Sequence, residues 1–171
     1  MMARVFLGLG SNLGNRLLSL RSAVSGVANL PGTRVLKASS VYETEPYGVK
    51  EQPEFLNAVL EIETKLDVDD LHRRLKAIEH EAGRIERTKW GPRELDIDIL
   101  FFESQQVRTA ALTIPHPGVG QRRFVLEPLA ELSREFTDPE TNMTVSEMLQ
   151  RCTDRSSVRK YSEELIVTEE N

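Results

Sequence analysis

The sequence predicts an α+β fold of the ferredoxin-like type, a sandwich in which an antiparallel sheet carries helices on one face. Three observations lead to this fold class. Strand and helix patterns follow the order βαββαβ over residues 5–102, which is the order of that fold. The connections between these patterns are short, and the 171 residues contain neither an internal repeat nor a long linker. We therefore expect a single domain over residues 1–171.

The first half of this pattern consists of a strand, a helix and two strands. The apolar run Val5–Gly10 predicts a buried strand, and apolar residues at steps of three and four over 17–27 predict a helix. Two strands are expected at 33–42 and 55–64. The intervening residues 43–53 are polar and rich in proline and glycine, which is typical of a loop.

The second half consists of a helix and a strand. Asp67 is a favourable N-cap for a helix whose apolar stripe runs over 68–82, and Gly83 is expected to end it. A loop at 84–94 then leads into Leu95–Phe102, the strongest strand pattern in the chain.

Beyond the βαββαβ unit, the sequence predicts C-terminal helical additions. A short strand is expected at 105–109, a proline-rich loop at 115–121, and helical segments near 125–132 and 144–151. Residues 154–171 are polar, and we expect them to form a loosely packed tail.

Composition restricts the classes of function. The formal net charge of −5 argues against a general nucleic-acid-binding protein, which usually carries a strongly basic surface. Cys152 is the only cysteine, so an intramolecular disulfide is excluded. No apolar run approaches the length of a membrane span or a signal peptide. We expect a cytoplasmic protein that binds neither nucleic acid nor membranes.

Two carboxylates stand out in the strand at 95–102. Because side chains alternate along a strand, Leu95, Ile97 and Ile99 are expected to face the core. Asp96 and Asp98 then share the opposite face, with Cα atoms roughly 6.6–7 Å apart. Mg²⁺ suits such a pair, because it binds one or two carboxylates and completes its shell with water and phosphate oxygens. Taken alone, the pair also fits a half-buried strand with two solvated acids.

Cationic residues gather around this strand. They are Arg84, Arg87, Lys89 and Arg93 before it and Arg122 and Arg123 after it. Arginine binds phosphate oxygens in a bidentate manner, so cations beside a carboxylate pair indicate a site for a metal and a polyphosphate. His116, between two prolines, is a candidate contact for a phosphate. Separately, these residues also fit a solvated basic loop and a structural histidine.

Glycines and aromatic residues complete the candidate groups. The segment from Gly8 to Gly14 lies between a strand and a helix but matches neither the dinucleotide-binding nor the P-loop pattern, so a tight turn is the default interpretation. A flat heterocycle could be held by aromatic rings with an amide at its edge. The residues suited to this are Tyr47, Phe55, Asn57, Trp90 and Phe124, although Phe55 and Phe124 also fit an ordinary core.

Several motifs in order make the chain resemble the 6-hydroxymethyl-7,8-dihydropterin pyrophosphokinases of folate biosynthesis. The most specific is the stretch from Trp90 to Leu100, WGPRELDIDIL. The others are Gly10–Gly14 (GSNLG), Tyr42–Pro46 (YETEP), Gln52–Asn57 (QPEFLN), Gly83-Arg84, Leu112–Pro117 (LTIPHP) and Arg122–Pro128 (RRFVLEP). The resemblance extends from about residue 3 to about residue 150 and implies the same ferredoxin-like fold.

The resemblance implies transfer of pyrophosphate from ATP to the hydroxymethyl group of the pterin, with release of AMP. Asp96 and Asp98 would bind two magnesium ions, and Arg84 and Arg93 would act with them in catalysis. ATP would contact Glu79, Arg84, Trp90, Arg93, Ile99, Thr113, His116 and Arg122. The pterin would contact Thr44, Glu45, Tyr47, Phe55, Asn57, Trp90 and Phe124. ATP and the pterin are the expected partners, and we expect a monomer.

Two alternatives remain at this point. The first is another magnesium-dependent enzyme on the same fold, either a phosphotransferase or a nucleotidyl transferase. The second is a non-catalytic ferredoxin-like module that binds a small ligand and needs no paired metal carboxylates.

Overall fold

The structure is a computed structural model, and it describes residues 1–46, 51–82 and 94–166. Its main sheet has six strands in the order β5-β1-β4-β3-β8, with β2 also paired to β4, and every pairing is antiparallel. The strands are β1 (Ala3–Ser11), β2 (Thr33–Ala38), β3 (Tyr42–Thr44), β4 (Phe55–Thr64), β5 (Asp96–Phe102) and β8 (Val158–Lys160). A small second sheet pairs β6 (Val107–Arg108) with β7 (Thr113–Ile114).

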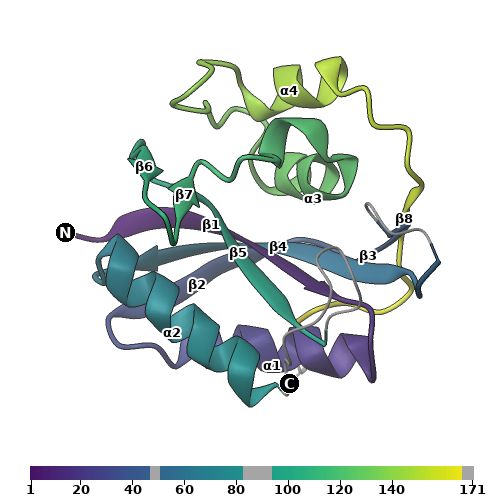
Figure 1. The fold of residues 1–171 in the computed structure, drawn as a ribbon, viewed down its shortest axis with the longest axis horizontal. Coiled ribbons are helices and arrows are strands. Elements are labelled where there is room, and N and C mark those ends of the chain that lie inside the picture. Colours follow the sequence, from purple (N-terminus) through teal and green to yellow (C-terminus); the bar gives the residue numbers. More distant parts are fainter. Residues whose placement is uncertain (47–50, 83–93, 167–171) are drawn as a thin grey trace, which may run out of the picture.

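Helices cover both faces of the main sheet (Figure 1). Helices α1 (Arg16–Ala28) and α2 (Val68–Glu81) lie on one face, while α3 (Arg123–Ser133) and α4 (Val145–Arg151) lie on the other. A short 3-10 helix, Val119–Gln121, precedes α3. The βαββαβ unit is therefore present as predicted. The C-terminal helical additions form a third layer on the face that a two-layer sandwich would leave open.

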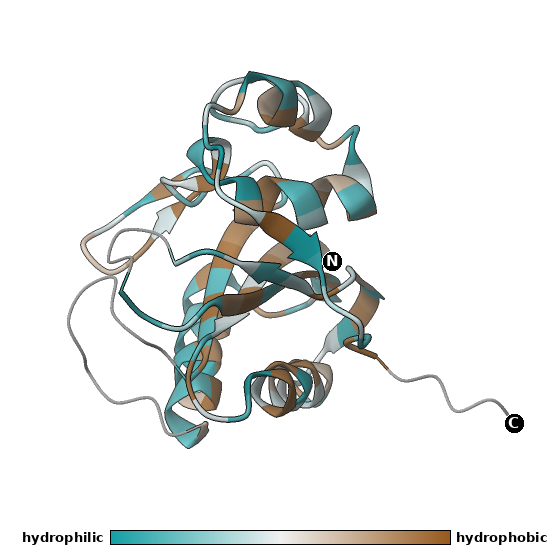
Figure 2. Cartoon of the chain, turned by 90° about the vertical axis from the view of Figure 1, so that its right-hand side faces the viewer, coloured by the Kyte–Doolittle hydropathy of each residue, from teal (hydrophilic) through white to brown (hydrophobic). Residues whose placement is uncertain are grey.

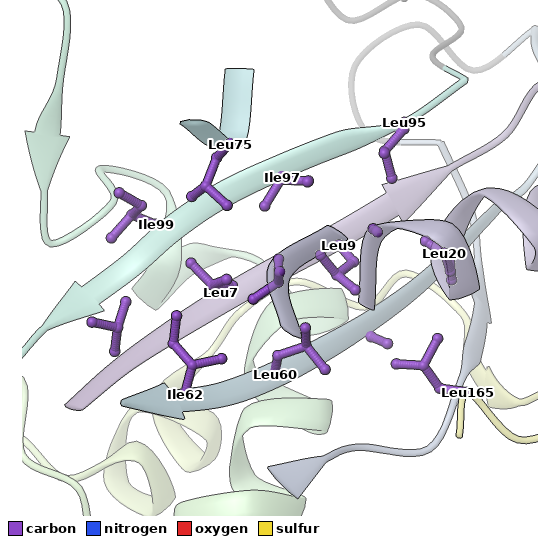
Figure 3. Close-up of a cluster of buried hydrophobic side chains, with 14 of the residues drawn as sticks. Leu7, Leu9, Leu20, Leu60, Ile62, Leu75, Leu95, Ile97, Ile99 and Leu165 are labelled. Carbon is purple, nitrogen blue, oxygen red and sulfur yellow. The ribbon is translucent and has the colours of Figure 1, made fainter. Parts of the chain in front are cut away.

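Two hydrophobic clusters hold these layers together. Residues on one side of the strands, such as Leu7, Leu60 and Ile97, join α1 and α2 in the first cluster (Figure 3). Phe6, Val59 and Leu126 belong to the second cluster, which contains residues of α3 and α4. Brown and teal stretches alternate along the helices in Figure 2, as expected of helices that place one face on a sheet. In the described ranges, none of the helices could cross a membrane.

The single strand expected at 33–42 is divided into β2 and β3. Between them, the backbone N–H of Ser39 donates to the carbonyl of Val59, and the hydroxyl of Ser39 accepts from the N–H of Val59. The side chain of Ser39 thereby takes the place of a regular ladder bond. Both strands still pair with β4, so the division changes the outline of the sheet but not its order.

The polar tail expected from residue 154 is anchored at two places in the part that the structure describes. Strand β8 pairs with β3, and the side chain of Leu165 is buried in the first hydrophobic cluster. A three-residue edge strand is held mainly by backbone hydrogen bonds, which leave no hydrophobic pattern, so the polar composition does not reveal it.

Candidate active site

The paired carboxylates lie on the face of the sheet that carries α3. Leu95, Ile97 and Ile99 are buried in the first cluster, so Asp96 and Asp98 point to the other face, as the alternation of strand side chains predicts. The side chain of Asp98 is 49% exposed. Strand β5 is at the edge of the main sheet, next to β1, so the two carboxylates lie at this edge.

Gly10 on β1 leaves a gap without a side chain, here called the hollow, between Asp96 and Asn57. Gly10 is paired with Asp96 on one side and with Asn57 on the other. Directly opposed residues in an antiparallel sheet have their side chains on the same face. A Cβ atom at Gly10 would lie 2.8 Å from Oδ1 of Asn57, so a side chain at this position would close the gap between the acid and the amide.

The next row of the sheet also has a glycine on β1. Gly8 is paired with Asp98 and with Val59, and a Cβ atom at Gly8 would lie 3.3 Å from Cδ2 of Leu100. The side chain of Leu100 therefore covers the backbone at Gly8, and the backbone that lies between Asp96 and Asn57 is that of Gly10. The turn expected around these glycines lies further along, because Gly8 and Gly10 belong to β1 itself.

The far side of the hollow carries a buried amide and hydroxyl. Nδ2 of Asn57 donates to Oγ1 of Thr44 at 2.6 Å, and both residues are buried. This bond fixes the amide with its Oδ1 atom toward Gly10. Phe55 lies on the same face of β4, and its ring carbon Cδ1 would be 3.6 Å from a Cβ atom at Gly10. These three predicted pterin contacts are therefore adjacent.

His116 faces the carboxylate side of the hollow. Its backbone N–H donates to the carbonyl of Leu100, and Nδ1 accepts from the N–H of Gly118. Nδ1 is thus an acceptor, which leaves the proton of the neutral ring on Nε2, 3.9 Å from Oδ2 of Asp98. Burial lowers the pKa of His116; Asp98 opposes this shift, and Arg122 adds to it. The lowered pKa favours the neutral ring, whose Nε2 lies near Asp98 but beyond hydrogen-bond distance.

The start of α3 carries Arg122 and Phe124, and Arg122 lies close enough to His116 to affect its pKa. The guanidinium of Arg122 lies over Gly118, where a Cβ atom would be 2.4 Å from its Nε. Phe124 is half-buried and packs against the second hydrophobic cluster. Arg123 is turned elsewhere, because its side chain binds Glu127 and the carbonyl of Ser156. Arg122 and not Arg123 is thus the cation that this turn offers to the site.

Glu79 supports β5 from the side of α2. Its carboxylate is buried, and Oε1 accepts from the backbone N–H of Ile97 at 2.8 Å. Oε2 lies 3.3 Å from Nζ of Lys76, which is about half exposed. Ile97 separates the two aspartates in the sequence, so this bond fixes the strand between them. The family resemblance implies a nucleotide contact for Glu79 and does not indicate this role.

The remaining described candidates lie around the edge of the site. Ile99 places its side chain in the core, so its backbone is the part available to a ligand. Thr113 belongs to β7, which packs against β5. Oε1 of Glu45 accepts from the backbone N–H of Ser157, and its side chain therefore contacts the C-terminal segment.

Part of the predicted site belongs to segments outside the described residues. The residues concerned are Tyr47, Arg84, Arg87, Lys89, Trp90 and Arg93, together with Gly83 at the expected end of α2. Both predicted catalytic arginines, Arg84 and Arg93, are among them.

The carboxylates of Asp96 and Asp98 suit Mg²⁺ better than they suit a metal ion whose whole coordination shell comes from protein side chains. Among the residues that the structure describes, no group of three or more histidine, cysteine, aspartate or glutamate side chains could hold a metal ion. A pair of carboxylates such as Asp96 and Asp98 leaves most of a six-coordinate shell to water and phosphate oxygens, as Mg²⁺ prefers. The arrangement therefore fits a metal that enters together with a polyphosphate.

One supporting residue gave no sequence signal. The carboxylate of Glu131 in α3 accepts from the N–H and hydroxyl of Ser40 and from the hydroxyl of Tyr42. Burial and this carboxylate raise the pKa of Tyr42. Residues 40 and 131 are far apart in the chain, and only the folded sheet brings them together.

Comparisons with known proteins place the chain in a family. The model of the family "7,8-dihydro-6-hydroxymethylpterin-pyrophosphokinase (HPPK)" matches residues 6–134. A 2-amino-4-hydroxy-6-hydroxymethyldihydropteridine pyrophosphokinase of Bacillus subtilis is 42% identical over 141 residues, covering 80% of this chain and 84% of its own. The Methylorubrum extorquens protein of that name is 44% identical over 135 residues, covering 79% and 85%.

Longer proteins also contain a region similar to this chain. The folic acid synthesis protein fol1 of Schizosaccharomyces pombe is 40% identical over 157 residues, which are 92% of this chain but 21% of that protein. A crystal structure of Plasmodium falciparum HPPK-DHPS, with pterin and p-hydroxybenzoate, has a TM-score of 0.70 at 17% identity. It covers 88% of this chain and 42% of that one, and it shows that the fold is shared. On the strength of the family match and the bacterial relatives, the chain belongs to the 7,8-dihydro-6-hydroxymethylpterin-pyrophosphokinase family.

Proposed function

We propose that the protein transfers pyrophosphate from ATP to the hydroxymethyl group of 6-hydroxymethyl-7,8-dihydropterin, releasing AMP, in the hollow between β5 and β4. The observation that carries this proposal is the position of Gly10, with Asp96 on one side and the bonded Asn57–Thr44 pair on the other. A polyphosphate on the acidic side and a heterocycle on the amide side would then meet above the glycine floor.

The acidic side is suited to ATP and magnesium. Asp96 and Asp98 would hold two magnesium ions, which would neutralise phosphate charge and lower the pKa of the pterin hydroxyl. His116 and Arg122 would hold phosphate oxygens through Nε2–H and the guanidinium. Arg84 and Arg93 would add charge from the segment outside the described residues. Transfer of this kind needs alignment of the reactants and charge neutralisation, so no side chain has to form a covalent bond.

The amide side is suited to the pterin. Asn57 offers Oδ1 toward the hollow, where an amino group at the edge of a heterocycle could donate to it. Phe55 and Phe124 offer apolar rings for stacking on a flat ligand. Thr44 and Glu45 belong to the same wall, and Tyr47 and Trp90 would complete the pocket. We further propose that the protein acts as a monomer, a state that sedimentation velocity would test.

Product analysis is the most direct test. With ATP, the pterin and Mg²⁺, we expect AMP and the pterin diphosphate in equal amounts. Formation of ADP would indicate an ordinary phosphotransferase, and release of free pyrophosphate would indicate a nucleotidyl transferase. Binding of ATP that is insensitive to Mg²⁺, without turnover, would indicate a non-catalytic module.

The role of the carboxylates is tested with an isosteric variant. Asp98→Asn keeps the shape of the side chain and removes its charge, so we expect turnover to fall by roughly 10²–10³, the typical loss when one transition-state contact is removed. The midpoint of thermal unfolding without magnesium should barely change, because this side chain is about half exposed. Asp69→Asn, an exposed acid in the first turn of α2, serves as the control. Equal turnover in the two variants would overturn the assignment.

A further inference from the structure

The C-terminal segment Asp154–Lys160 contacts two elements that carry proposed pterin contacts. The first element is the start of α3, where Phe124 lies. The second is strand β3, which contains Thr44, together with its neighbouring residues. This segment lies beyond residues 6–134, the part of the chain that the family model matches. The family match therefore does not describe the contacts that this segment makes.

At α3, Asp154 provides a cap that the helix itself lacks. The N-cap residue, Arg122, makes no side-chain capping hydrogen bond. Instead, Oδ2 of Asp154 accepts from the backbone N–H of Arg123 at 3.0 Å, across 31 residues of sequence. Oδ1 of the same carboxylate accepts from the N–H and the hydroxyl of Ser156. An anion at a helix N-terminus is favourable, so Asp154 fixes the first turn of α3 to the C-terminal segment.

At β3, the same segment makes backbone and charged contacts. The N–H of Ser157 donates to Oε1 of Glu45, and Val158 is paired with Thr44 in the β3–β8 ladder. Arg159 binds Oε1 of Glu43 at 3.3 Å and Oε2 of Glu54 at 2.9 Å. Glu54 directly precedes Phe55 in the sequence, so Arg159 joins the two strands on which Thr44 and Phe55 lie.

Because only two residues separate Asp154 from Ser157, the distance between these anchors is limited. Such a span reaches at most about 10–11 Å when fully extended. The segment consequently limits how far the first turn of α3, with Phe124, can move from β3 and Thr44. A pocket that holds a flat ring between aromatic side chains depends on this spacing, since preorganised walls bind a ligand without a cost of ordering.

We propose that Asp154 and Arg159 are positioning residues that set the width of the pterin pocket. This inference rests on the proposed location of that pocket. Neither residue needs to contact a substrate. Asp154 holds the α3 wall, Arg159 holds the β3–β4 wall, and the chain between them couples the two.

The test compares Asp154→Ala with Asp67→Ala. Both variants remove a carboxylate that accepts from a backbone N–H at the start of a helix, and Asp67 caps α2 at Asp70. We expect a similar small fall in the midpoint of thermal unfolding for both. Only Asp154→Ala should weaken binding of 6-hydroxymethylpterin in the presence of a non-hydrolysable ATP analogue, by about tenfold. The KM for the pterin should rise accordingly, with a smaller change in kcat.

A second matched pair tests the other anchor. Arg159→Met and Arg34→Met each remove an arginine that pairs with a glutamate across neighbouring strands, Glu43 and Glu63 respectively. Only Arg159→Met should weaken pterin binding. Equal pterin affinity in all four variants and the wild type would overturn the positioning role. If Asp154→Ala does not fold, Asp154→Asn, which retains one acceptor oxygen, and Arg159→Met decide the question.

Two further variants separate this inference from the proposed pocket. If Asn57→Ala and Phe124→Ala leave pterin affinity unchanged, the location of the pocket is wrong. If they weaken it while Asp154→Ala and Arg159→Met do not, the pocket stands and the positioning role is refuted.

Discussion

Glu79 offers a sharp test of how β5 is held, because its buried carboxylate accepts from the N–H of Ile97 between the two aspartates. We consider the substitution Glu79→Ala. It leaves this N–H without an acceptor on the outer side of an edge strand and removes the support of the carboxylate pair. We expect a loss of both stability and activity.

The magnitude of the stability loss follows from the contact. An unsatisfied buried N–H costs about 1–3 kcal/mol, and each lost buried methylene adds about 0.8 kcal/mol. The substitution also removes the desolvation cost of the buried carboxylate, which offsets part of this loss. In the wild type this cost is only partly compensated, because the partner Lys76, 3.3 Å away, is itself about half exposed. A net loss of about 2 kcal/mol corresponds to a fall of about 4–8 °C in the unfolding midpoint for a chain of this size.

We would measure the unfolding midpoint by calorimetry and kcat and KM by steady-state kinetics, and compare Glu79→Ala with Glu79→Gln. Glutamine keeps an acceptor oxygen for Ile97, so we expect a loss below about 1 kcal/mol and nearly normal kcat. Glu79→Ala should lower kcat, because the spacing of Asp96 and Asp98 depends on the strand between them. An unchanged unfolding midpoint in Glu79→Ala, with only the KM for ATP raised, would refute this reasoning and indicate a nucleotide contact alone.

The remaining predictions concern the hollow and the charged contacts of β8. Gly10→Ala places a Cβ atom 2.8 Å from Oδ1 of Asn57, so we expect the hydrogen bond between Asn57 and Thr44 to break. The affinity for the pterin, measured by titration, should then fall more than the affinity for ATP. An equal fall in both affinities would contradict this prediction. Burial alone would raise the pKa of Glu43, but Arg16 and Arg159 lower it below its usual 4.5. Its stabilising contribution is present above pH 4.5 and is lost as the pH falls through the lowered value. In denaturant unfolding, the free energy of unfolding of Arg159→Met should therefore decrease less than that of the wild type as the pH falls from about 5 to about 3. If the free energy depends on pH equally in both proteins, the pairing of Arg159 with Glu43 is excluded.

Much of the fold could be predicted because its signals are local. The apolar runs of β1, β4 and β5 and the capped, amphipathic α2 are each readable within about fifteen residues. The alternation in β5 also places Asp96 and Asp98 on one face without any tertiary information. The same period of two places Phe55 and Asn57 together on β4.

What could not be predicted depends on contacts between distant parts of the chain. The break between β2 and β3 arises from Ser39, whose hydroxyl replaces a ladder bond, and nothing in the local pattern distinguishes it from a strand residue. Glu131 and Asp154 bind groups 91 and 31 residues away, respectively. A polar residue gives no periodic signal for such a bond. The tail therefore resembled loose chain, although Leu165 is buried.

The glycine floor of β1 has a consequence for inhibitors. A compound seated there rests on main-chain atoms, which no point substitution can remove. In the proposed site, a side chain introduced at Gly10 would also occupy space that the substrates need, because its Cβ atom would lie 2.8 Å from Oδ1 of Asn57. Resistance to such a compound should therefore arise in the surrounding walls, and compounds that gain most of their affinity from the floor should be the hardest to escape.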